Sequence, residues 1–177
     1  MMKNNVLIVV DMQVGVLAIP RYDREGKAAL INQLIDAADV VIFIQHAEGE
    51  MGVGGDLWQI IPELQQPAHA HYVTKTACDG FWNTTLDALL QRLGINAFTV
   101  CGCATDYCVD TTIKVGASKG YAITVAADAH TTADRTYARA QQLIGQHNEV
   151  WAGLSLPGNP VTVIPVATIL SAWRSPL

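Results

Sequence analysis

Short runs of apolar, often β-branched residues alternate along this chain with longer stretches in which apolar residues recur at helical spacing. The first run, Val6–Val10, has no polar residue, as expected for a central parallel strand that is covered on both faces. Strands that alternate with helices are typical of repeated βαβ units. We therefore expect an α/β fold, a three-layer αβα sandwich whose mainly parallel, Rossmann-like central sheet has about six strands. The further strands are predicted at residues 40–44, 71–74, 98–101, 122–126 and 161–164.

The clearest helix signal is a stripe of leucines at i, i+3, i+4 and i+7, which are Leu86, Leu89, Leu90 and Leu93. Gly94 follows in the position of a C-terminal cap. The other helices are predicted around residues 29–37, over 106–119 with Gly120 as the stop, from about 134 to 150, and after a Gly/Pro-rich turn at 157–160 up to Trp173.

Residues 45–70 break this alternation, because they hold four glycines, two prolines and Trp58 with little periodicity. Irregular connections of this length in compact domains are usually functional. We expect this segment to form a pocket wall or an oligomer contact. With no internal repeat and no linker-like stretch, residues 1–177 are predicted to form one domain.

Composition narrows the function classes. Half of the 177 residues are apolar and 15% are charged, with a net charge of −5, so neither a nucleic-acid footprint nor a basic membrane patch is visible. We expect a small-molecule partner, with no nucleic acid and no membrane. No stretch reads as a signal peptide or a membrane span, which predicts a cytoplasmic protein with reduced thiols.

Cys108 stands where a predicted strand gives way to a predicted helix. A thiol at a helix start lies near free backbone N–H groups, which favour the thiolate. Asp11 and Lys75 also stand at predicted strand ends, and ligands of open parallel sheets collect at the carboxyl ends of the strands. Each residue alone has an ordinary structural explanation, as a turn former, a surface lysine or a buried thiol. Their joint occurrence predicts a site.

The neighbouring polar residues are predicted to be structural. Asp106 and Asp110 are interpreted as helix-start residues, with Thr105 as an alternative cap. Cys101 is expected in the core and Cys103 beside the site, on opposite faces of their strand. Asp128 is expected to orient a loop.

Four motifs, taken in order, carry a resemblance to a known family. They are Val-Val-Asp11-Met-Gln13, Lys75 with Phe81, Thr84 and Leu86 behind it, Gly102-Cys-Ala-Thr-Asp-Tyr-Cys108-Val, and Asp128-Ala129. Together they resemble the isochorismatase-like hydrolases, a cysteine hydrolase superfamily that includes nicotinamidases and other small-amide hydrolases.

The resemblance implies a role for each matched residue. Asp11 would be the general base, Lys75 the cation that stabilises the thiolate, and Cys108 the nucleophile that forms a thioester with the acyl group. The backbone N–H groups of Ala104 and Cys108 would form the oxyanion hole. The peptide bond between Cys103 and Ala104 is expected to be cis.

The metal site of nicotinamidases is not expected here. Their Asp-x-His pair is replaced by Gln45-His46-Ala47-Glu48, so His46 is interpreted as a hydrogen-bonded strand-end residue, and no metal or other cofactor is predicted. The pair His69 and His71 is expected to bind a metal ion at most adventitiously.

Aromatic residues supply the expected pocket wall, with Phe81 interpreted as core. Trp58, Trp82 and Tyr107 are predicted to bind a flat or compact acyl group. Because the family often completes its pocket from a neighbouring subunit, a homo-oligomer is expected.

The leading hypothesis is a metal-independent cysteine amidohydrolase of small molecules. An isochorismatase, which cleaves a vinyl ether, needs no thiol and would need basic groups for a dicarboxylate. Arg21, Arg24 and Arg135 are not clearly placed for that from sequence. A nicotinamidase and, outside enzymes, a thiol redox or small-molecule-binding protein remain open, although no C-x-x-C motif is present.

Overall fold

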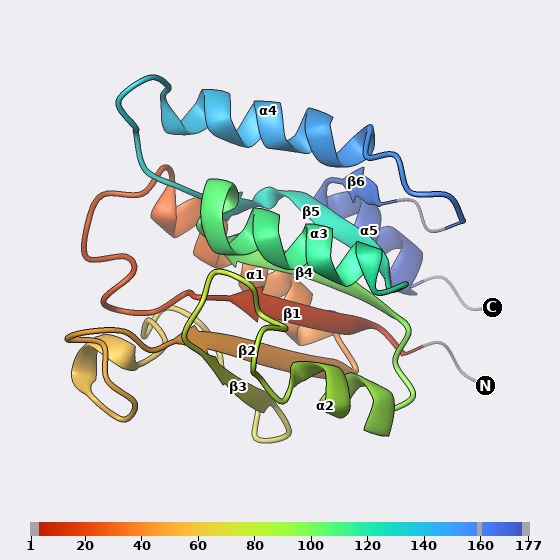
Figure 1. The fold of residues 1–177 in the computed structure, drawn as a ribbon, viewed down its shortest axis with the longest axis horizontal. Helices are drawn as coiled ribbons and strands as arrows, with labels where there is room; N and C mark the ends of the chain where they lie inside the picture. Colours follow the sequence, from red (N-terminus) through yellow and green to blue (C-terminus); the bar gives the residue numbers. More distant parts are fainter. Residues whose placement is uncertain (1–3, 159–160, 175–177) are drawn as a thin grey trace.

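The computed structural model of this chain describes residues 4–158 and 161–174, and it contains one six-stranded sheet in the order β3-β2-β1-β4-β5-β6 (Figure 1). All neighbouring strands pair in parallel, which confirms the predicted α/β class. The strands are β1 (Val6–Val10), β2 (Val40–His46), β3 (His71–Lys75), β4 (Ala97–Cys103), β5 (Ala122–Thr131) and β6 (Thr162–Ile164).

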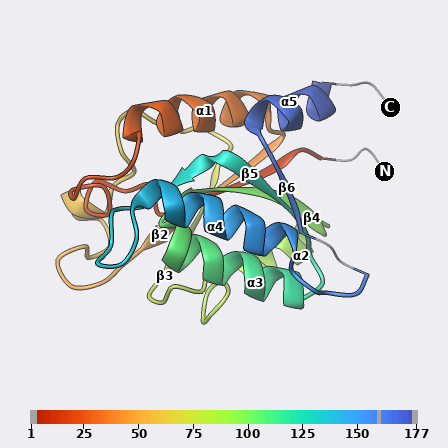
Figure 2. The same cartoon turned by 90° about the horizontal axis from the view of Figure 1, so that it is seen from above.

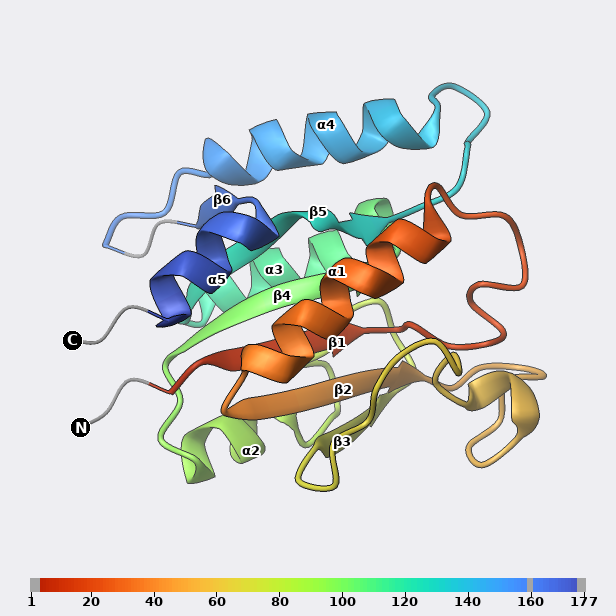
Figure 3. The same cartoon turned by 180° about the vertical axis from the view of Figure 1, so that it is seen from behind.

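Helices cover both faces of the sheet, so the fold has three layers (Figure 2). On one face lie α1 (Arg24–Ala37) and α5 (Val166–Arg174), which Figure 3 shows in front of the strands. The other face is covered by α2 (Leu86–Arg92), α3 (Asp110–Ser118) and α4 (Ala140–Ala152).

Side chains of β1 alternate between these two layers. Leu7 and Val9 pack in the core cluster that includes residues of α1 and α5, while Ile8 and Val10 pack in the cluster that includes residues of α2 and α3. The central strand is therefore apolar at every position because both of its faces are buried.

The strand order reverses between β1 and β4. The chain proceeds outward from β1 through β2 to β3, and then returns to place β4 on the other side of β1. Ligands of doubly wound sheets bind at such a switch point, beyond the carboxyl ends of the strands. Figure 1 shows the long segments that follow β1, β2 and β5 gathered at this same edge of the sheet.

Two glycines are required by the backbone. Gly102 in β4 has φ +119°, and a Cβ at this position would overlap the carbonyl oxygen of Val10. Only glycine lets β4 come this close to β1 at the switch point. Gly94 has φ +66°, and its N–H donates to the Gln91 carbonyl at 3.0 Å, which confirms the predicted end of α2.

The predicted helix from about 134 begins six residues later, at Ala140. The Asp134 carboxylate accepts the Ala140 N–H at 2.9 Å, and Gln142 accepts the N–H of Arg139 through its side chain. These contacts define the helix start, so residues 132–139 form a connection at the edge of the sheet instead of a first helical turn.

The predicted helix 106–119 starts as a π-helical turn, Thr105–Val109, and continues as α3. Its N-cap is Ala104, and neither Thr105 nor Asp106 caps it with a side chain, contrary to expectation. Elsewhere β5 runs five residues past its predicted end at Ala126, with a register shift against β4. Residues 159–160 of the predicted turn lie outside the described part of the chain.

Among the residues that the structure describes, no helix combines the length and the apolar character needed to cross a membrane.

Candidate active site

Asp11, Lys75 and Cys108 converge at the switch point, although 97 positions separate the first from the last. The Lys75 ammonium lies 2.7 Å from the Asp11 carboxylate and donates to the Cys108 sulfur at 3.3 Å. Lys75 is 1% exposed and Asp11 is 2% exposed. The buried ion pair therefore stands directly beside the thiol.

The end of β1 is held by backbone geometry and by one glutamine. Asp11 takes the left-handed conformation with φ 47°, which aspartate tolerates better than most residues, and its N–H donates to the Ile44 carbonyl at 2.9 Å. The Gln13 side chain accepts the His46 N–H at 2.7 Å and donates to the Trp58 carbonyl at 2.9 Å. Gln13 thus fastens β1 to β2 and to the long connection.

The Lys75 ammonium has more hydrogen-bond acceptors around it than N–H donors. Besides Asp11 and Cys108, its ammonium contacts His46 Nδ1 and the Ala77 carbonyl, both at 2.9 Å. An ammonium carries three N–H donors. With four acceptors around it, at least one N–H is shared between two acceptors. The ammonium is therefore held firmly in place.

The hydrogen bond from Lys75 also determines the tautomer of His46. Because Nδ1 accepts from Lys75, we assign the imidazole proton to Nε2, which faces the Glu48 carboxylate at 3.0 Å. The prediction of a hydrogen-bonded His46 at a strand end is confirmed.

The proton positions follow from burial and from the neighbouring charges. Burial raises the pKa of Asp11 even though Lys75 acts in the opposite direction. Burial acts to lower the pKa of Lys75, but Asp11 and Cys108 outweigh it and the pKa is raised. Burial and then the Asp11 charge raise the pKa of Cys108, against the pull of Lys75. Burial thus opposes the ionised forms of Asp11 and Cys108, whereas the Lys75 ammonium favours them.

One oxygen of the site has no role in holding the structure together. Asp11 Oδ1 is buried and has no hydrogen-bond partner in the described chain. Carboxylate, imidazole and sulfur atoms of Asp11, His46 and Cys108 all lie within 4.8 Å of one another. A carboxylate oxygen this close to the sulfur is suited to receive the thiol proton.

A cavity of about 460 Å³ opens onto this group, a size that suits a small organic molecule. Its lining residues are Asp11, Val16, Arg21, His46, Glu48, Thr76, Ala77, Cys78, Ala104, Tyr107, Cys108 and Arg135.

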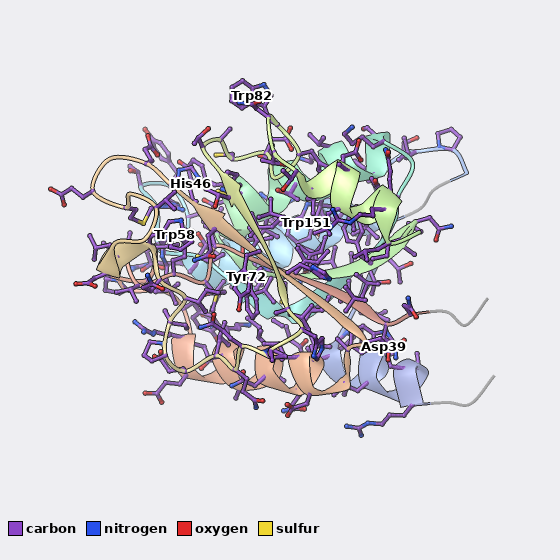
Figure 4. All side chains as sticks on the ribbon, turned by 90° about the horizontal axis from the view of Figure 1, so that it is seen from below. Asp39, His46, Trp58, Tyr72, Trp82 and Trp151 are labelled. Carbon is purple, nitrogen blue, oxygen red and sulfur yellow. The ribbon has the colours of Figure 1, made fainter. Side chains whose placement is uncertain are left out.

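Of the three aromatic residues predicted to bind substrate, only Tyr107 lines this cavity. Trp82 is 59% exposed and points away from the fold (Figure 4). Trp58 belongs to a 3₁₀ turn, Asp56–Trp58, in the long connection, and its carbonyl accepts from Gln13 and Gln45. The long connection therefore supports the site through the Trp58 carbonyl and also lines the cavity through Glu48. Phe81 is buried in the core, as predicted.

Two arginines of the cavity were missed as site residues by the sequence analysis. Arg135 makes a two-point contact with Asp106, at 2.8 and 3.2 Å, and lies over the Tyr107 ring at 4.7 Å. Asp106 thus holds Arg135 in position. Burial acts to raise the pKa of Asp106, but these hydrogen bonds outweigh it and the pKa is lowered. Arg21 reaches the cavity from the loop after β1. No motif or spacing predicts that either residue lines the cavity, because both stand in irregular connections.

The remaining polar predictions have simple outcomes. Arg24 lies outside the cavity lining and pairs with Glu63 at 2.8 Å. Asp110 pairs with Lys114 at 2.9 Å and accepts the Trp151 indole N–H at 2.8 Å. Asp128 accepts the Val166 N–H at 2.8 Å at the start of α5, which agrees with a structural role.

The cysteines other than Cys108 are not arranged as a redox pair. All four cysteines of the chain are free thiols. Cys101 and Cys103 pack in the same core cluster, so the expectation of opposite faces was wrong, because residues two apart on a strand share a face. Burial raises the pKa of Cys103 to about 12. The cis peptide bond between Cys103 and Ala104 is confirmed.

Asp11, His46 and Cys108 are also residue types that bind metals, and they form a group with ligand-like spacing. The Lys75 ammonium, however, contacts all three of these side chains. A cation placed among them would meet this positive charge, so the residues fit a metal ion poorly as long as Lys75 is protonated. His71 begins β3 and Lys75 ends it, so the His69 and His71 pair stands at the other end of that strand.

Fold and site together define an α/β protein with an acid, a lysine and a thiol at the switch point of its sheet. The sequence model of the isochorismatase domain matches residues 5–147. The chain belongs to the isochorismatase family of hydrolases.

Individual relatives agree with this assignment. A streptothricin hydrolase of Streptomyces noursei is 29% identical over 137 residues, which are 72% of this chain and 50% of that protein. A ureidoacrylate amidohydrolase of Serratia proteamaculans is 34% identical over 96 residues, covering 54% of this chain and 39% of that protein. The chain thus spans about half the length, or less, of these curated relatives.

Solved structures resemble the chain over nearly its whole length. The crystal structure of an isochorismatase family protein has a TM-score of 0.84 at 29% identity, covering 93% of this chain and 99% of the other. A cysteine hydrolase from Pseudomonas syringae pv. phaseolicola has a TM-score of 0.86 at 22% identity, covering 97% and 92%. The second likeness concerns the fold alone.

Proposed function

We propose that this protein is a metal-independent cysteine amidohydrolase that cleaves a C–N bond of a small molecule through a thioester at Cys108. The observation that carries the proposal is the convergence of a thiol, a buried carboxylate with one unpartnered oxygen, and an ammonium at the mouth of a cavity. Two relatives, which are named a hydrolase and an amidohydrolase, support the same reaction class.

The first half-reaction begins with a proton transfer. Asp11 takes the Cys108 proton as the sulfur attacks the carbonyl carbon, which gives a tetrahedral intermediate with a negative oxygen. Lys75, held by four acceptors, stays in place and stabilises the negative charge that develops on the sulfur. Asp11 then returns the proton to the leaving nitrogen, the C–N bond breaks, and the acyl group remains on sulfur as a thioester.

The second half-reaction reverses these roles with water. Asp11 takes a proton from water as the water oxygen attacks the thioester carbon. The C–S bond then breaks, and Asp11 returns the proton to the sulfur, which releases the acid and restores the thiol. In our proposal the N–H groups of Ala104 and Cys108 stabilise the oxyanion in both steps. Both residues line the cavity, and the Ala104 carbonyl is turned into the helix start, where it accepts the N–H groups of Tyr107 and Val109 at 3.1 Å.

A second candidate function is the hydrolysis of a vinyl ether that carries carboxylates. The presence of Arg21 and Arg135 in the cavity favours it, since it removes the objection that basic groups are missing. That reaction needs no sulfur nucleophile, so Cys108 separates the two candidates.

The test uses a panel of small primary amides, hydroxamates and cyclic ureides, with release of ammonia or carboxylate as the readout. Replacing Cys108 by alanine is expected to lower kcat/KM by about 10³-fold or more, because the nucleophile is lost. Mass spectrometry of the quenched wild-type reaction should show an acyl group on the peptide that contains Cys108.

The matched control is Cys101→Ala, which removes another buried thiol and should retain turnover per folded molecule. Turnover by the Cys108→Ala variant would refute the thioester mechanism, and vinyl ether cleavage by this variant would establish the second candidate.

We further propose that Tyr107 contacts the substrate and that the active form is a homo-oligomer. The single chain gives Trp58 and Trp82 no place at the cavity lining, so any contact of theirs with substrate would require a second molecule. Light scattering at micromolar concentration tests the oligomer, and a sharp monomer peak would refute it.

A further inference from the structure

Cys78 places a second thiol at the cavity, and the proposed reaction has no use for it. Cys78 and Cys108 both line the cavity, and both are half-buried free cysteines. The other two cysteines of the chain, Cys101 and Cys103, are buried in the core. A small reagent that enters the cavity to reach Cys108 therefore also meets Cys78.

The main chain at Cys78 is bonded on both sides to the surroundings of Cys108. The peptide group that leads into Cys78 has the Ala77 carbonyl, which accepts from the Lys75 ammonium at 2.9 Å. The same ammonium donates to the Cys108 sulfur at 3.3 Å. On the other side, the Cys78 carbonyl accepts from the Thr112 hydroxyl at 3.4 Å. These bonds use main-chain carbonyls, so the Cys78 sulfur takes no part in them.

Thr112 connects this segment to the helix that carries Cys108. It stands four positions after Cys108, and residues at this spacing share one face of a helix. The Gly80 N–H donates to the Thr112 hydroxyl at 3.0 Å, and a Cβ on Gly80 would lie 3.1 Å from the Thr112 side chain. The chain after β3 is therefore packed directly on α3, one turn beyond Cys108.

The electrostatics agree with this proximity. Burial and then the Asp11 charge raise the pKa of Cys108, and a charge on Cys78 adds to them. Cys108 has the Lys75 ammonium and the Asp11 carboxylate beside it to take up its proton and stabilise the sulfur anion. Cys108 is thus the thiol of the pair that these groups prepare for attack, and Cys78 is its neighbour.

We propose that Cys78 and Cys108 form a dithiol site, at which a small hydroperoxide oxidises Cys108 and Cys78 then joins it in a disulfide. The disulfide would block the nucleophile of the proposed function reversibly. The inference rests on that function only for the role of Cys108, and the oxidation itself requires no amide hydrolysis.

The oxidation balances in two steps. Asp11 takes the Cys108 proton, the sulfur attacks one peroxide oxygen, and the O–O bond breaks. The departing oxygen receives the proton and leaves as water or an alcohol, and Cys108 becomes a sulfenic acid. The Cys78 sulfur then attacks the Cys108 sulfur, the S–O bond breaks, and the hydroxyl leaves as water with the Cys78 proton. Two electrons pass from the two thiols to the peroxide.

The test treats the reduced protein with hydrogen peroxide, blocks the remaining thiols with iodoacetamide and maps the peptides by mass spectrometry without reduction. The peptide that contains Cys78 should be joined to the peptide that contains Cys108. Dithiothreitol should separate the two peptides and restore alkylation of Cys108. In Cys78→Ser this crosslink should be lost, and Cys108 should accumulate as sulfinic and sulfonic acids that dithiothreitol does not reduce.

The matched control is Cys101→Ala, which removes a buried thiol outside the cavity and should keep the crosslink. Equal accumulation of sulfinic acid at Cys108 in the wild type and in Cys78→Ser would overturn the proposal. A crosslink from Cys108 to Cys101 or Cys103 would overturn it as well. Oxidation of a mixture of isotope-labelled and unlabelled protein should give no mixed pairs, and mixed pairs would refute a disulfide within one chain.

A wild-type experiment keeps the proposal testable if Cys78→Ser fails to fold. Phenylarsine oxide bonds two neighbouring thiols through one arsenic atom and releases water. It should protect Cys78 and Cys108 together from iodoacetamide, and dithiothreitol should reverse this protection whereas the monothiol β-mercaptoethanol should not. Alkylation of both cysteines at the unprotected rate would refute the dithiol site.

Amide turnover by the reduced protein separates this proposal from the proposed function. If the disulfide forms but the reduced protein hydrolyses no amide, the dithiol site stands and the amidase fails. If the reduced protein hydrolyses amides but peroxide oxidises Cys108 without joining it to Cys78, the amidase stands and the dithiol site fails.

Discussion

Two buried polar clusters lie close to the turn that carries Cys108, and they differ in how completely their hydrogen bonds are made. The first is the Asp11, Lys75 and Cys108 site. The second joins three elements through His130, whose Nδ1 lies 2.7 Å from the Thr105 hydroxyl and whose Nε2 lies 2.8 Å from Asn148 Oδ1. Both clusters are built from side chains that stand far apart in the sequence.

In the His130 cluster the hydrogen bonds determine which group donates and which accepts. The Asn148 amide donates to the Ala127 carbonyl at 2.9 Å, so its oxygen accepts from His130 Nε2 and the Thr105 hydroxyl donates to Nδ1. Burial lowers the pKa of His130 to about 4, which keeps the imidazole neutral. A fully satisfied network of this kind rigidifies the fold.

The Asp11 cluster has a surplus of acceptors instead. Asp11 Oδ1 has no partner within the described residues, and the Lys75 ammonium is shared among more acceptors than it has protons. Incomplete pairing therefore distinguishes the Asp11 cluster, for which we propose a proton transfer, from the His130 cluster, whose hydrogen bonds are satisfied.

The largest expected effects come from the Asp11 and Lys75 pair. Asp11→Asn should lower kcat/KM by about 10²–10⁴-fold, because the general base is lost. Asp11→Asn and Lys75→Met should each lower the free energy of unfolding by about 3–5 kcal/mol, since each leaves a buried charge without its partner. The double variant should recover part of that stability, as measured by urea denaturation.

The matched control for this cycle is Lys114→Met, which removes a half-exposed partner of Asp110 and should change stability by about 1 kcal/mol or less. If the free energy of unfolding lost in the double variant equals the sum of the losses in the two single variants, the two charges are not coupled. The contrast between the two clusters is then lost.

The second prediction concerns the pH dependence contributed by His130. Between pH 6.5 and about 4 the unfolded chain binds a proton at this imidazole that the folded chain does not. The free energy of unfolding should therefore fall by up to about 3 kcal/mol as the pH drops through this window. His130→Gln should flatten this part of the profile in denaturation curves recorded from pH 7 to pH 4. An unchanged slope would show that the pKa of His130 is the same in the folded and unfolded protein.

The smallest expected effect is that of Thr105→Val. It removes the hydroxyl that donates to His130 and should cost about 1 kcal/mol of stability, because a buried acceptor loses its donor. Per folded molecule, kcat/KM should stay unchanged, since Thr105 belongs to the satisfied cluster. A large loss of kcat without loss of stability would mean that this cluster takes part in the reaction and would break the comparison.

The sequence analysis located the residues that converge at the candidate site because strand ends and ordered motifs mark them. Asp11 directly follows the apolar strand β1, Lys75 ends β3, and Cys108 follows the glycine-containing end of β4. The start of α4 was placed six residues too early because the Asp134 carboxylate defines the helix start at Ala140 by a side-chain contact. Periodicity cannot register such a contact.

Other features of the site escaped for the same reason. Arg135 finds Asp106 across 29 positions, and the carbonyl of Thr132 meets the N–H of Tyr22 across the sheet edge. Side chains in irregular connections follow no period, so their position depends on contacts that only the folded chain makes.

The sequence by itself determined the layered α/β architecture, the location of each strand and the placement of Asp11, Lys75 and Cys108 at or after strands, because the burial of a parallel sheet imposes a pattern on every strand. Only the tertiary structure decided that burial acts against ionisation of the thiol, that Lys75 stands amid the groups that would otherwise suit a metal, and that Arg21 and Arg135 line the cavity. Those properties depend on distances and on exclusion from water, and both arise when segments remote in the sequence meet at one edge of the sheet.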